Sequence, residues 1–448
     1  MKDFAKSGDP KIQGQLDRLS ALALPQGEIG LDMIHEILSR LGNPQHKIPP
    51  VFHVAGTNGK GSTCAYLHAM LEAQGYSVHV ATKPHLVRYN ERIRLAGELI
   101  SDDLLGELLE EVLDICEDLG PSFFEVTTAA TFLAFARVPA DVCVIEVGLG
   151  GRFDATNVLS KPAACGITSL GVDHDHFLLT EDPTAPSPDN PKVRIAFEKV
   201  GIARRNSPMV TQDYREDMEA MIAKRCAEEG APLIMRGKMW HAEIGNECIA
   251  YRDEQGALAL PLPQMPGSHQ GDNAALAVAM LRHQQELHVS PEAMAKGIAS
   301  AIWPARLQVL GKGPLTDRVP NAMVLLDGGH NPDAARAMAK FLDNKADKPV
   351  DAIFGMLGVK DARTTLEIIA PHLASFTAIP IQDSDYHPLE DLAAMARDAG
   401  VANVFTAESL EAALDSVATH HQTGGTILIA GSLYLAGNVL EANGEIPS

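Results

Sequence analysis

Residues 56–63, with the sequence GTNGKGST, combine glycines, a lysine and hydroxyl side chains directly after an apolar run. Backbone N–H groups of a glycine-rich turn converge on a concavity, and the start of a helix adds partial positive charge. Lys60 can then reach the outer phosphates of a nucleotide, although Gly61 separates it from Ser62, unlike the strict Walker A spacing. The alternative is a tight strand–helix turn with an exposed lysine. Because an apolar run precedes the turn and a helical pattern follows it, the sequence predicts a nucleotide-phosphate site.

Glu146 ends the apolar run of the segment DVCVIEVG. Such a run predicts a buried strand, and in open α/β sheets ligands bind beyond the carboxyl ends of the strands. A carboxylate at that place can bind Mg²⁺, a hard cation that prefers oxygen ligands. The alternative is a structural acid capped by backbone N–H groups of the following GLGG. The phosphate-type turn elsewhere in the chain favours the metal.

Two further groups of residues leave alternatives open. His174 and His176 flank Asp175 in GVDHDHF, after another apolar run, and spacing alone does not decide between metal ligands and ordinary hydrogen-bonding residues. Lys199 lies in the apolar helix end IAFEKVGIARR, where a lysine whose stem packs on the core while its ammonium reaches water is the default interpretation.

The C-terminal part of the chain places polar residues after apolar runs in LLDGGHNPDA, GMLGVKDA and GSLYLAG. Ordinary turn chemistry explains this pattern. The functional interpretation is a second domain that presents its own strand ends to the nucleotide.

Apolar runs that alternate with helical patterns must position these residues, and this alternation is typical of an α/β fold. Strands are predicted at residues 51–56, 76–83, 140–148, 164–171, 322–330, 350–357, 374–381, 402–407 and 425–431. Helices are predicted at residues 61–75, 101–120, 127–138, 271–287, 290–302, 333–344 and from about 361. Residues 180–192, rich in Pro and Asp, predict a surface loop, and residues 206–263 a helix and a short β-ribbon.

The length and composition limit the possible classes of protein. A chain of 448 residues exceeds one ordinary core, and we place a domain boundary near residue 303, giving domains 1–302 and 303–448. The balance of 37 Lys and Arg against 58 Asp and Glu, a net charge of −21, argues against a nucleic-acid partner. No apolar run approaches the roughly 20 residues that cross a bilayer. The N-terminus lacks a secretory pattern and the six cysteines are scattered, so we expect a cytoplasmic protein with reduced thiols.

Several long blocks, in order along nearly the whole chain, resemble one family. They are HVAGTNGKGST, PHLVRYNERIRLAG, FFEVTTAATFLAF, IEVGLGGRFDATN, DHDHF followed by EKVGI, GSHQGDNAA, WPARLQ, DGGHNP and GSLYLAG. Together they resemble bifunctional dihydrofolate synthase/folylpolyglutamate synthase, a branch of the Mur ligase superfamily.

The resemblance implies an N-terminal P-loop ATPase domain with a mostly parallel sheet and a C-terminal Rossmann-like α/β domain. It implies a monomeric ligase that uses ATP and Mg²⁺ to join L-glutamate to dihydropteroate, and to the γ-carboxyl of a reduced folate, through an acyl phosphate. Phosphorylation turns a poor electrophile into one with a leaving group, and exclusion of water protects it. Concentrated positive charge must stabilise phosphoryl transfer between anions.

The resemblance also implies roles for individual residues. The implied nucleotide contacts are Thr57, Asn58, Gly59, Lys60, Gly61 and Ser62, with Thr63, Asn273, Arg306 and Asp327. The implied Mg²⁺ ligands are Glu146, His174 and Lys199, the last as a carbamate. His330 and Ser432 match residues that hold glutamate, and the pterin pocket is implied at Ser122, Phe123, Phe124, Phe153, Asp154 and Ala155.

The chain departs from the family pattern at several positions. Lys83 stands where the family has a serine that ligates Mg²⁺, and an ammonium group has no lone pair for a metal. The segment LLTEDPTAPSPDN replaces a shorter family motif, and Ala305 and Gly329 stand where Gly and Ala are usual. Lys83 therefore motivates an alternative function, a nucleotide-binding homologue with impaired catalysis. A ligase acting on a cell-wall precursor is a third hypothesis, against which the FFEVTT and GRFDATN blocks favour a pterin.

Overall fold

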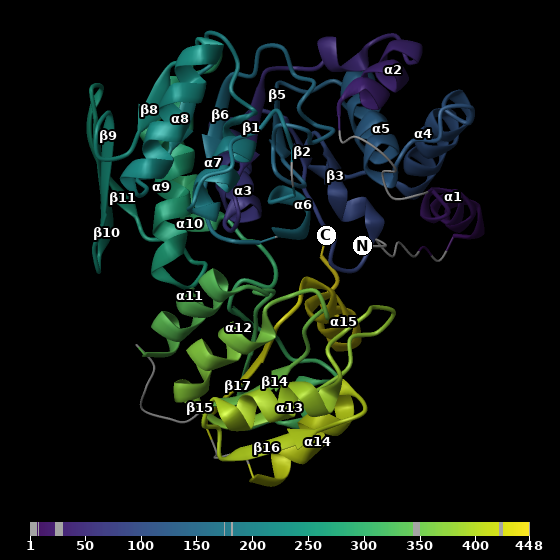
Figure 1. Cartoon of the computed structure of the whole chain (residues 1–448), viewed down its shortest axis with the longest axis vertical. Helices are drawn as coiled ribbons and strands as arrows, with labels where there is room; N and C mark the ends of the chain where they lie inside the picture. The colour runs from purple at the N-terminus through teal and green to yellow at the C-terminus, as the bar shows by residue number, and fades with distance from the viewer. Residues whose placement is uncertain are drawn as a thin grey trace. The chain divides into compact units, whose positions relative to one another are not determined.

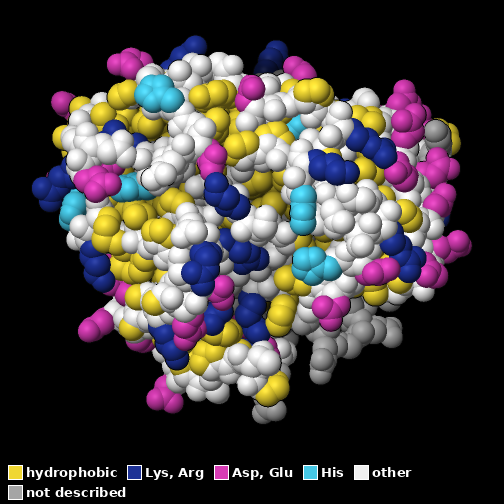
Figure 2. Space-filling model, turned by 90° about the horizontal axis from the view of Figure 1, so that it is seen from above, with side chains coloured by type: hydrophobic (Ala, Val, Ile, Leu, Met, Phe, Trp, Pro, Cys, Tyr) yellow, Lys and Arg dark blue, Asp and Glu magenta, His cyan; other side chains and the backbone are white. Residues whose placement is uncertain are grey.

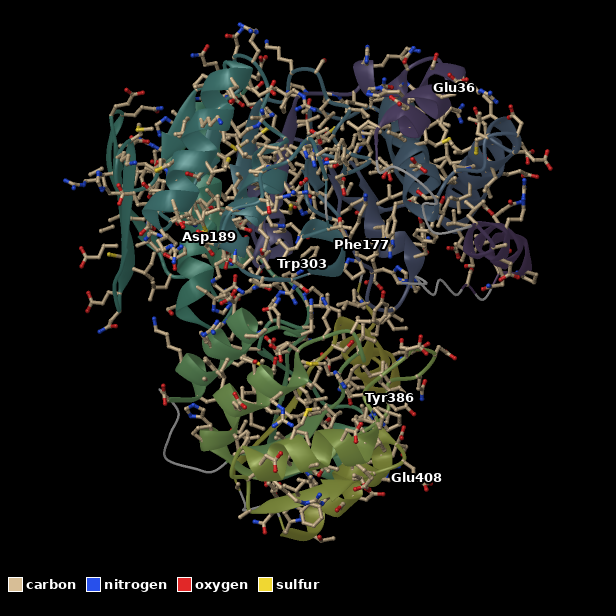
Figure 3. The ribbon with its side chains drawn as sticks, viewed as in Figure 1. Glu36, Phe177, Asp189, Trp303, Tyr386 and Glu408 are labelled. Carbon is tan, nitrogen blue, oxygen red and sulfur yellow. The ribbon has the colours of Figure 1, made fainter. Side chains whose placement is uncertain are left out.

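Two sheets, each with its own helices, organise the chain into two units (Figure 1). The computed structural model describes residues 7, 9–22, 30–173, 175–180, 182–343, 350–420 and 424–447. Residues 1–264 and 270–302 form the first unit, and residues 265–269 and 303–448 form the second. The main part of the second unit thus begins at Trp303, which is labelled in Figure 3.

The first unit contains an eight-stranded sheet with the order β4-β3-β2-β5-β1-β6-β7-β8. Its strands are β1 (Val51–Ala55), β2 (Val78–Ala81), β3 (Ile93–Leu95), β4 (Glu98–Leu99), β5 (Val142–Glu146), β6 (Ala164–Ile167), β7 (Met209–Thr211) and β8 (Leu233–Met235). From β2 to β8 neighbouring strands are parallel, and β3 and β4 add an antiparallel edge. Every residue of β1, β2, β5 and β6 is buried, as expected of parallel strands covered on both faces.

Helices cover this sheet and an antiparallel ribbon flanks it (Figure 1). The helices are α1 (Pro10–Ser20), α2 (Asp32–Arg40), α3 (Lys60–Gln74), α4 (Asp102–Ile115), α5 (Phe123–Arg137), α6 (Asp175–Leu178), α7 (Pro191–Val200), α8 (Glu216–Glu229), α9 (Ser268–His283) and α10 (Pro291–Ser300). The ribbon is β9 (Trp240–Ile244), β10 (Cys248–Asp253) and β11 (Gly256–Pro261). Helices α3 and α10 pack closely, because a Cβ atom on Gly297 would lie 2.5 Å from the backbone of Met70.

The second unit contains a six-stranded sheet with the order β12-β13-β17-β14-β15-β16. Its strands are β12 (Gln308–Val309), β13 (Met323–Leu326), β14 (Val350–Phe354), β15 (Leu373–Ala378), β16 (Asn403–Thr406) and β17 (Thr426–Ala430). Its helices are α11 (Pro332–Asp343), α12 (Ala362–Ile369), α13 (Leu389–Asp398), α14 (Leu410–His420) and α15 (Leu433–Asn443). All neighbouring strands are parallel except β12 and β13. The α/β fold class with parallel-rich sheets in two units is therefore confirmed.

Two predicted helices differ at their ends. The helix predicted to stop at Gly120 ends at Ile115, and the backbone N–H of Cys116 closes its last turn. Helix α5 begins at Phe123 rather than near residue 127, because the Ser122 side chain caps it by accepting a hydrogen bond from the Glu125 N–H. Helices α1, α2, α6, α13, α14 and α15 were not predicted.

All six cysteines are free, and five of them are buried. Figure 2 shows Lys and Arg side chains interspersed with acidic and apolar ones over one face, with acidic side chains along its right-hand edge. Within the described part of the chain, none of the helices has the length and apolar character that a membrane span requires.

Candidate active site

A turn between β1 and α3 forms the centre of the site in the first unit. Gly59 adopts the left-handed conformation with φ 89° directly before Lys60, the first residue of α3. A Cβ atom on Gly59 would lie 2.4 Å from Oδ1 of Asn273, so the amide side chain of Asn273 lies against the turn. Glycine is therefore required at position 59 for both its conformation and its size.

Hydrogen bonds to the segment after β6 fix the shape of this turn. The Thr57 N–H donates to the Ser169 carbonyl at 2.7 Å, and the Thr57 hydroxyl donates to the Gly171 carbonyl at 2.9 Å. The Thr168 hydroxyl donates to the Asn58 carbonyl at 2.7 Å. The neighbouring parallel strand thus preorganises the phosphate-type turn.

Two ammonium groups lie at the start of the turn. Nζ of Lys60 and Nζ of Lys199 donate to the Gly56 carbonyl at 3.2 and 2.8 Å. Lys199 is buried at the end of α7, so its ammonium group does not reach water and the default interpretation from the sequence is wrong. Burial, together with the charge of Lys60, lowers the pKa of Lys199 to about 7.

Two hydroxyl groups behind the turn are suited to a bound ligand. Ser62 Oγ and Thr63 Oγ1 are buried and have no hydrogen-bond partner among the described residues. Buried polar groups in proteins are normally paired, because an unpaired one costs roughly 1–3 kcal/mol. The turn therefore fits a magnesium–nucleotide, whose phosphate oxygens and cation would provide partners.

Glu146 lies at the carboxyl end of β5, next to β1, and is buried. Its Oε2 accepts a hydrogen bond of 3.1 Å from the backbone N–H of Lys83. Nζ of Lys83 donates to the Thr128 hydroxyl at 3.2 Å. The carboxylate thus lies at the carboxyl ends of the parallel strands, where a metal was predicted. Its neighbour Lys83 cannot ligate a metal, because an ammonium group has no lone pair. His174 lies outside the described residues.

Asp154 accepts four hydrogen bonds from the protein itself. Oδ2 accepts from the N–H groups of Gly148 at 3.0 Å and Leu149 at 2.9 Å. Oδ1 accepts from the N–H and the hydroxyl of Thr156 at 2.9 and 2.5 Å. Burial alone would raise the pKa of Asp154, but the Lys83 ammonium and these hydrogen bonds hold it below its usual value. Asp154 therefore shapes the turn after Glu146. These four bonds use most of the lone pairs with which Asp154 was predicted to accept hydrogen bonds from a pterin.

Aromatic side chains line the start of α5. Phe124 is 36% exposed, and its ring meets the buried ring of Phe123 edge to face at 5.4 Å. Ser122 caps the helix, and its hydroxyl donates to Glu125 at 2.7 Å. Phe124 can therefore pack on a flat ligand, whereas Ser122 and Phe123 support the helix that carries it.

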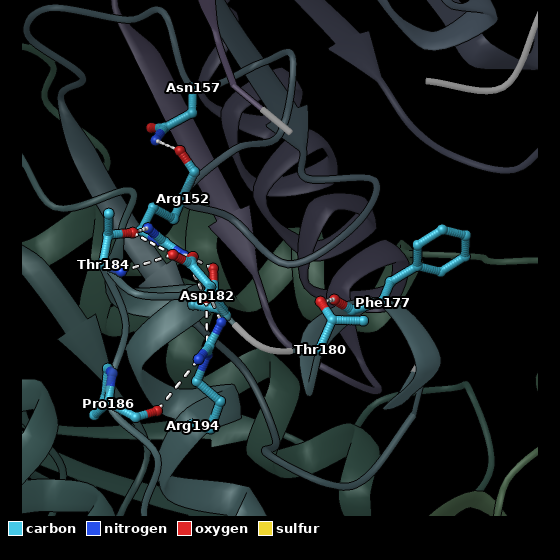
Figure 4. A network of polar contacts seen from close by, with 9 residues as sticks. Arg152, Asn157, Phe177, Thr180, Asp182, Thr184, Pro186 and Arg194 are labelled. Atoms are coloured by element: carbon cyan, nitrogen blue, oxygen red, sulfur yellow. Dashed lines mark hydrogen bonds and ion pairs between the residues drawn. The ribbon is translucent and has the colours of Figure 1, made fainter. Parts of the chain in front are cut away.

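Four charged residues tie the loop after β5 to α7: Arg194 and Glu198 are buried, and Arg152 and Asp182 are half-buried. Figure 4 shows Arg152, Asp182 and Arg194 close together. The guanidinium of Arg152 donates to Glu198 at 3.0 and 2.8 Å and to Asp182. Arg194 donates to the same Glu198 carboxylate at 3.0 Å. The Arg152 guanidinium also lies 4.0 Å over the ring of Phe153. We call these four charged residues, Arg152, Asp182, Arg194 and Glu198, the arginine–carboxylate cluster; it anchors the helix end that carries Lys199.

Residues predicted to contact ATP from the second unit lie at the carboxyl end of β13. Asp327 accepts hydrogen bonds from the N–H groups of Leu307 at 2.9 Å and Gly329 at 2.7 Å. Ala305 is buried with φ 55°, and its carbonyl accepts a hydrogen bond of 2.9 Å from Arg306. Asp327 thereby fixes the turn that presents Arg306.

The residues predicted to hold glutamate follow two neighbouring strands, β13 and β17. The ring nitrogen Nδ1 of His330 lies 3.0 Å from the Gly328 carbonyl. Ser432 caps α15, and its hydroxyl accepts a hydrogen bond of 3.1 Å from the Tyr434 N–H. A Cβ atom on Gly328 would lie 2.3 Å from a methyl group of Leu433, so these two strand ends are in contact. Gly329 is similarly confined, since a Cβ atom there would lie 2.7 Å from Asp327 Oδ1.

The arginine–carboxylate cluster and the hydrogen bond between Lys83 and Thr128 were not predicted. A signal was present in the sequence, because VRIAFEKV places Arg194, Glu198 and Lys199 within an otherwise apolar helix. Charges of opposite sign four residues apart on a helix pair with each other, but a buried pair also needs a further partner for its remaining donors and acceptors. The sequence does not identify that partner as Arg152.

Two sheets whose strand ends carry a glycine-rich turn, a buried carboxylate and a buried lysine fit one class of protein, the Mur-ligase-type enzymes, and the comparisons with known proteins show that class. A family model described as "Mur ligase, glutamate ligase domain" matches residues 305–433. The chain is 34% identical over 418 residues to the dihydrofolate synthase/folylpolyglutamate synthase of Escherichia coli, covering 92% of this chain and 91% of that protein. It therefore belongs to the dihydrofolate synthase/folylpolyglutamate synthase family.

Further relatives and solved structures support this family assignment. The Bacillus subtilis protein of the same name is 32% identical over 444 residues, covering 92% of this chain and 94% of that protein. A solved structure of E. coli FolC in complex with ADP has a TM-score of 0.84 and 32% identity, covering 98% of both chains. A solved folylpolyglutamate synthase/dihydrofolate synthase with Mn, AMPPNP and L-glutamate bound has a TM-score of 0.82 and 30% identity, covering 96% and 97%.

Proposed function

We propose that this chain is an ATP- and Mg²⁺-dependent ligase that joins L-glutamate to dihydropteroate and to the γ-carboxyl of reduced folates. The observation that carries this function is the preorganised turn at residues 57–60, with two ammonium groups at its start and the carboxylate of Glu146 on the neighbouring strand. This arrangement concentrates charge where a nucleotide's phosphates would lie, in a chain whose relatives are named as such synthases.

The residues of the turn would bind the nucleotide. The N–H groups of residues 59–61 and the side chains of Lys60, Ser62 and Asn273 would hold the phosphates, and Arg306 and Asp327 are the nucleotide contacts proposed on the second unit. Mg²⁺, when bound, would neutralise charge on the phosphates, and Glu146, His174 and Lys199 are the residues that would hold it. A neutral Lys199 amine can react with CO₂ to form a carbamate, which is an anion able to bind a metal.

The acceptor substrate would lie against the aromatic residues. Phe124 and Phe153 would pack on the pterin ring, supported by Ser122, Phe123, Asp154 and Ala155. A carboxylate oxygen of the substrate attacks the γ-phosphorus, the bond to the bridging oxygen of ADP breaks, and an acyl phosphate forms. The glutamate amine, held by His330 and Ser432, attacks the acyl carbon, phosphate leaves, and the nitrogen loses a proton to solvent.

The decisive experiment measures phosphate release by the purified chain with one component omitted at a time. Release should require ATP, Mg²⁺, L-glutamate and dihydropteroate or a reduced folate together. Equal release without glutamate or without any pteroyl substrate contradicts the ligase.

An impaired nucleotide-binding homologue, considered because of Lys83, is not supported by the relatives. Turnover by the wild-type chain in the same assay would exclude this impaired homologue. We further propose that the enzyme is a cytoplasmic monomer, which size-exclusion chromatography with light scattering and cell fractionation can test.

A further inference from the structure

Lys83 brings a positive charge to the carboxyl end of β2. Its backbone N–H donates to Glu146 at 3.1 Å and its Nζ donates to Thr128 at 3.2 Å. A Cβ atom on Gly148 would lie 3.2 Å from both Lys83 Cδ and Asp154 Oδ2, so the lysine stem passes close to Asp154. The ammonium group is therefore directed toward α5 and the turn after β5.

The strand order separates Lys83 from the phosphate turn. Strand β5 lies between β2 and β1, so Glu146 stands between Lys83 and the turn that follows β1. Lys60 and Lys199 share a carbonyl on the side of β1. Lys83 contacts Thr128, which lies one helical turn after the half-exposed Phe124 on α5. The charge of Lys83 thus lies on the α5 side of Glu146, where the acceptor substrate would bind.

An anionic substrate approaching this place meets two buried carboxylates, Glu146 and Asp154. Like charges in a poorly hydrated site repel strongly, so a cation is needed for a third carboxylate to enter. An ammonium group is a donor without lone pairs, which suits a carboxylate and excludes a metal-ligand role.

We propose that the Lys83 ammonium group binds the reacting carboxylate of the acceptor substrate and holds it for transfer of the γ-phosphoryl group. The proposal rests on the proposed ligase function. Lys83 contacts one carboxylate oxygen while the other forms the bond to phosphorus, so no proton is transferred in this step. The phosphate oxygens of the nucleotide have the same chemistry as a ligand for an ammonium group, but the strand order places them beside Lys60.

Calorimetric binding to the full chain without nucleotide tests this role with two pterins. Dihydropteroate carries the carboxylate, and 6-hydroxymethyl-7,8-dihydropterin lacks it. Lys83→Met should weaken dihydropteroate binding roughly 10- to 100-fold, the range of a lost charge-assisted hydrogen bond. Binding of the carboxylate-free pterin and of AMPPNP should change less than about twofold, and Lys83→Arg should restore most of the affinity.

Each other outcome contradicts the role. Equal weakening of both pterins by Lys83→Met indicates a structural residue, and weakening of AMPPNP instead indicates a phosphate contact. Unchanged dihydropteroate affinity in both Lys83→Met and Lys83→Gln also overturns it. These results leave the ligase function intact, whereas a wild-type chain that binds neither pterin contradicts the ligase function itself.

Discussion

Lys60 and Lys199, which are 139 positions apart in the sequence, donate hydrogen bonds to the same carbonyl oxygen, that of Gly56, at 3.2 and 2.8 Å. The proximity of two ammonium groups disfavours charge on both, and Lys199 is the buried one. The turn at residues 57–60 thus carries, beside the Lys60 ammonium group, a buried amine whose pKa is lowered to about 7.

This relationship predicts carbamate formation at Lys199. Because its pKa is lowered to about 7, the reactive neutral amine becomes dominant above that pH. With ¹³C-bicarbonate, a carbamate signal in the NMR spectrum should grow between about pH 6 and 8. Lys199→Arg should lack the signal, and in Lys199→Ala added bicarbonate or acetate should restore part of the activity. Wild-type activity in Lys199→Ala would assign the lysine a structural role only.

Phe124 and Phe123 allow a matched comparison between binding and folding. Phe124→Ala should raise KM for dihydropteroate about threefold to tenfold, the range of a lost stacking contact of about 0.5–1.5 kcal/mol, with little change in Tm. Phe123 is buried, so Phe123→Ala should lower stability by about 3–5 kcal/mol. Steady-state kinetics and thermal denaturation separate the two, and an unchanged KM in Phe124→Ala would contradict the stacking role.

Glu198 accepts hydrogen bonds from both Arg152 and Arg194 in the arginine–carboxylate cluster. Glu198→Gln should cost about 1.5–3 kcal/mol of stability, because it removes a charged acceptor from the buried Arg194 and the half-buried Arg152. Among the described residues, both arginines then keep only Asp182 as a charged partner. As a control, Asp415→Asn removes the partner of Arg318 in a pair exposed by 59% and 37%, and should cost less than about 1 kcal/mol. Chemical denaturation that gave equal effects would show that the cluster does not anchor α7.

Ala305 has a left-handed backbone, which is unfavourable for a residue with a Cβ atom by roughly 1–2 kcal/mol. Glycine relieves this strain, but its greater conformational freedom stabilises the unfolded chain by about 0.4–1 kcal/mol. Ala305→Gly should therefore be neutral or stabilise the chain by up to about 1 kcal/mol. Ala301 is the control, because it is buried with an ordinary φ of −61°. Ala301→Gly should therefore lower Tm.

His53 predicts an acid-sensitive fold. Burial lowers its pKa to about 3, while the unfolded chain has the ordinary value near 6.5. Between these values the unfolded state binds more protons, so the stabilisation is complete above about pH 6.5 and is lost as the pH falls toward 3. His53→Gln, which can keep a donor for the Thr156 hydroxyl, should flatten the dependence of Tm on pH in this window. An unchanged slope would show that other groups govern acid denaturation.

The turn at residues 56–63 and the strand that ends at Glu146 could be predicted because each is a local pattern, a glycine-rich turn or a continuous apolar run. The order of strands could not, since nothing in the sequence of β2 states that β5 rather than β1 lies beside it. The capping of α5 by Ser122 was missed because Phe123 and Phe124 obscure the helical period. Arg152 and Asp182 gain their meaning only from α7, a contact between distant segments.

The roles of Ser432, Asp327 and Asp154 show a second limit. Family motifs predict that these residues act on ligands, and the structure adds that each also satisfies backbone N–H groups. Whether the side chain of a motif residue binds a ligand or shapes a turn depends on its hydrogen bonds, and these cannot be read from the spacing of residues in the sequence. The assignment of ligands to these residues stays a prediction.

The hydrogen bonds from Thr57 to Ser169 and Gly171 have a consequence for how the site senses its ligand. The turn is joined by these bonds to the segment after β6, so a change in its backbone also changes the hydrogen bonds of that segment. We therefore expect a ligand that tightens the turn to shift the carboxyl end of β6 as well, because β1 and β6 are hydrogen-bonded neighbours.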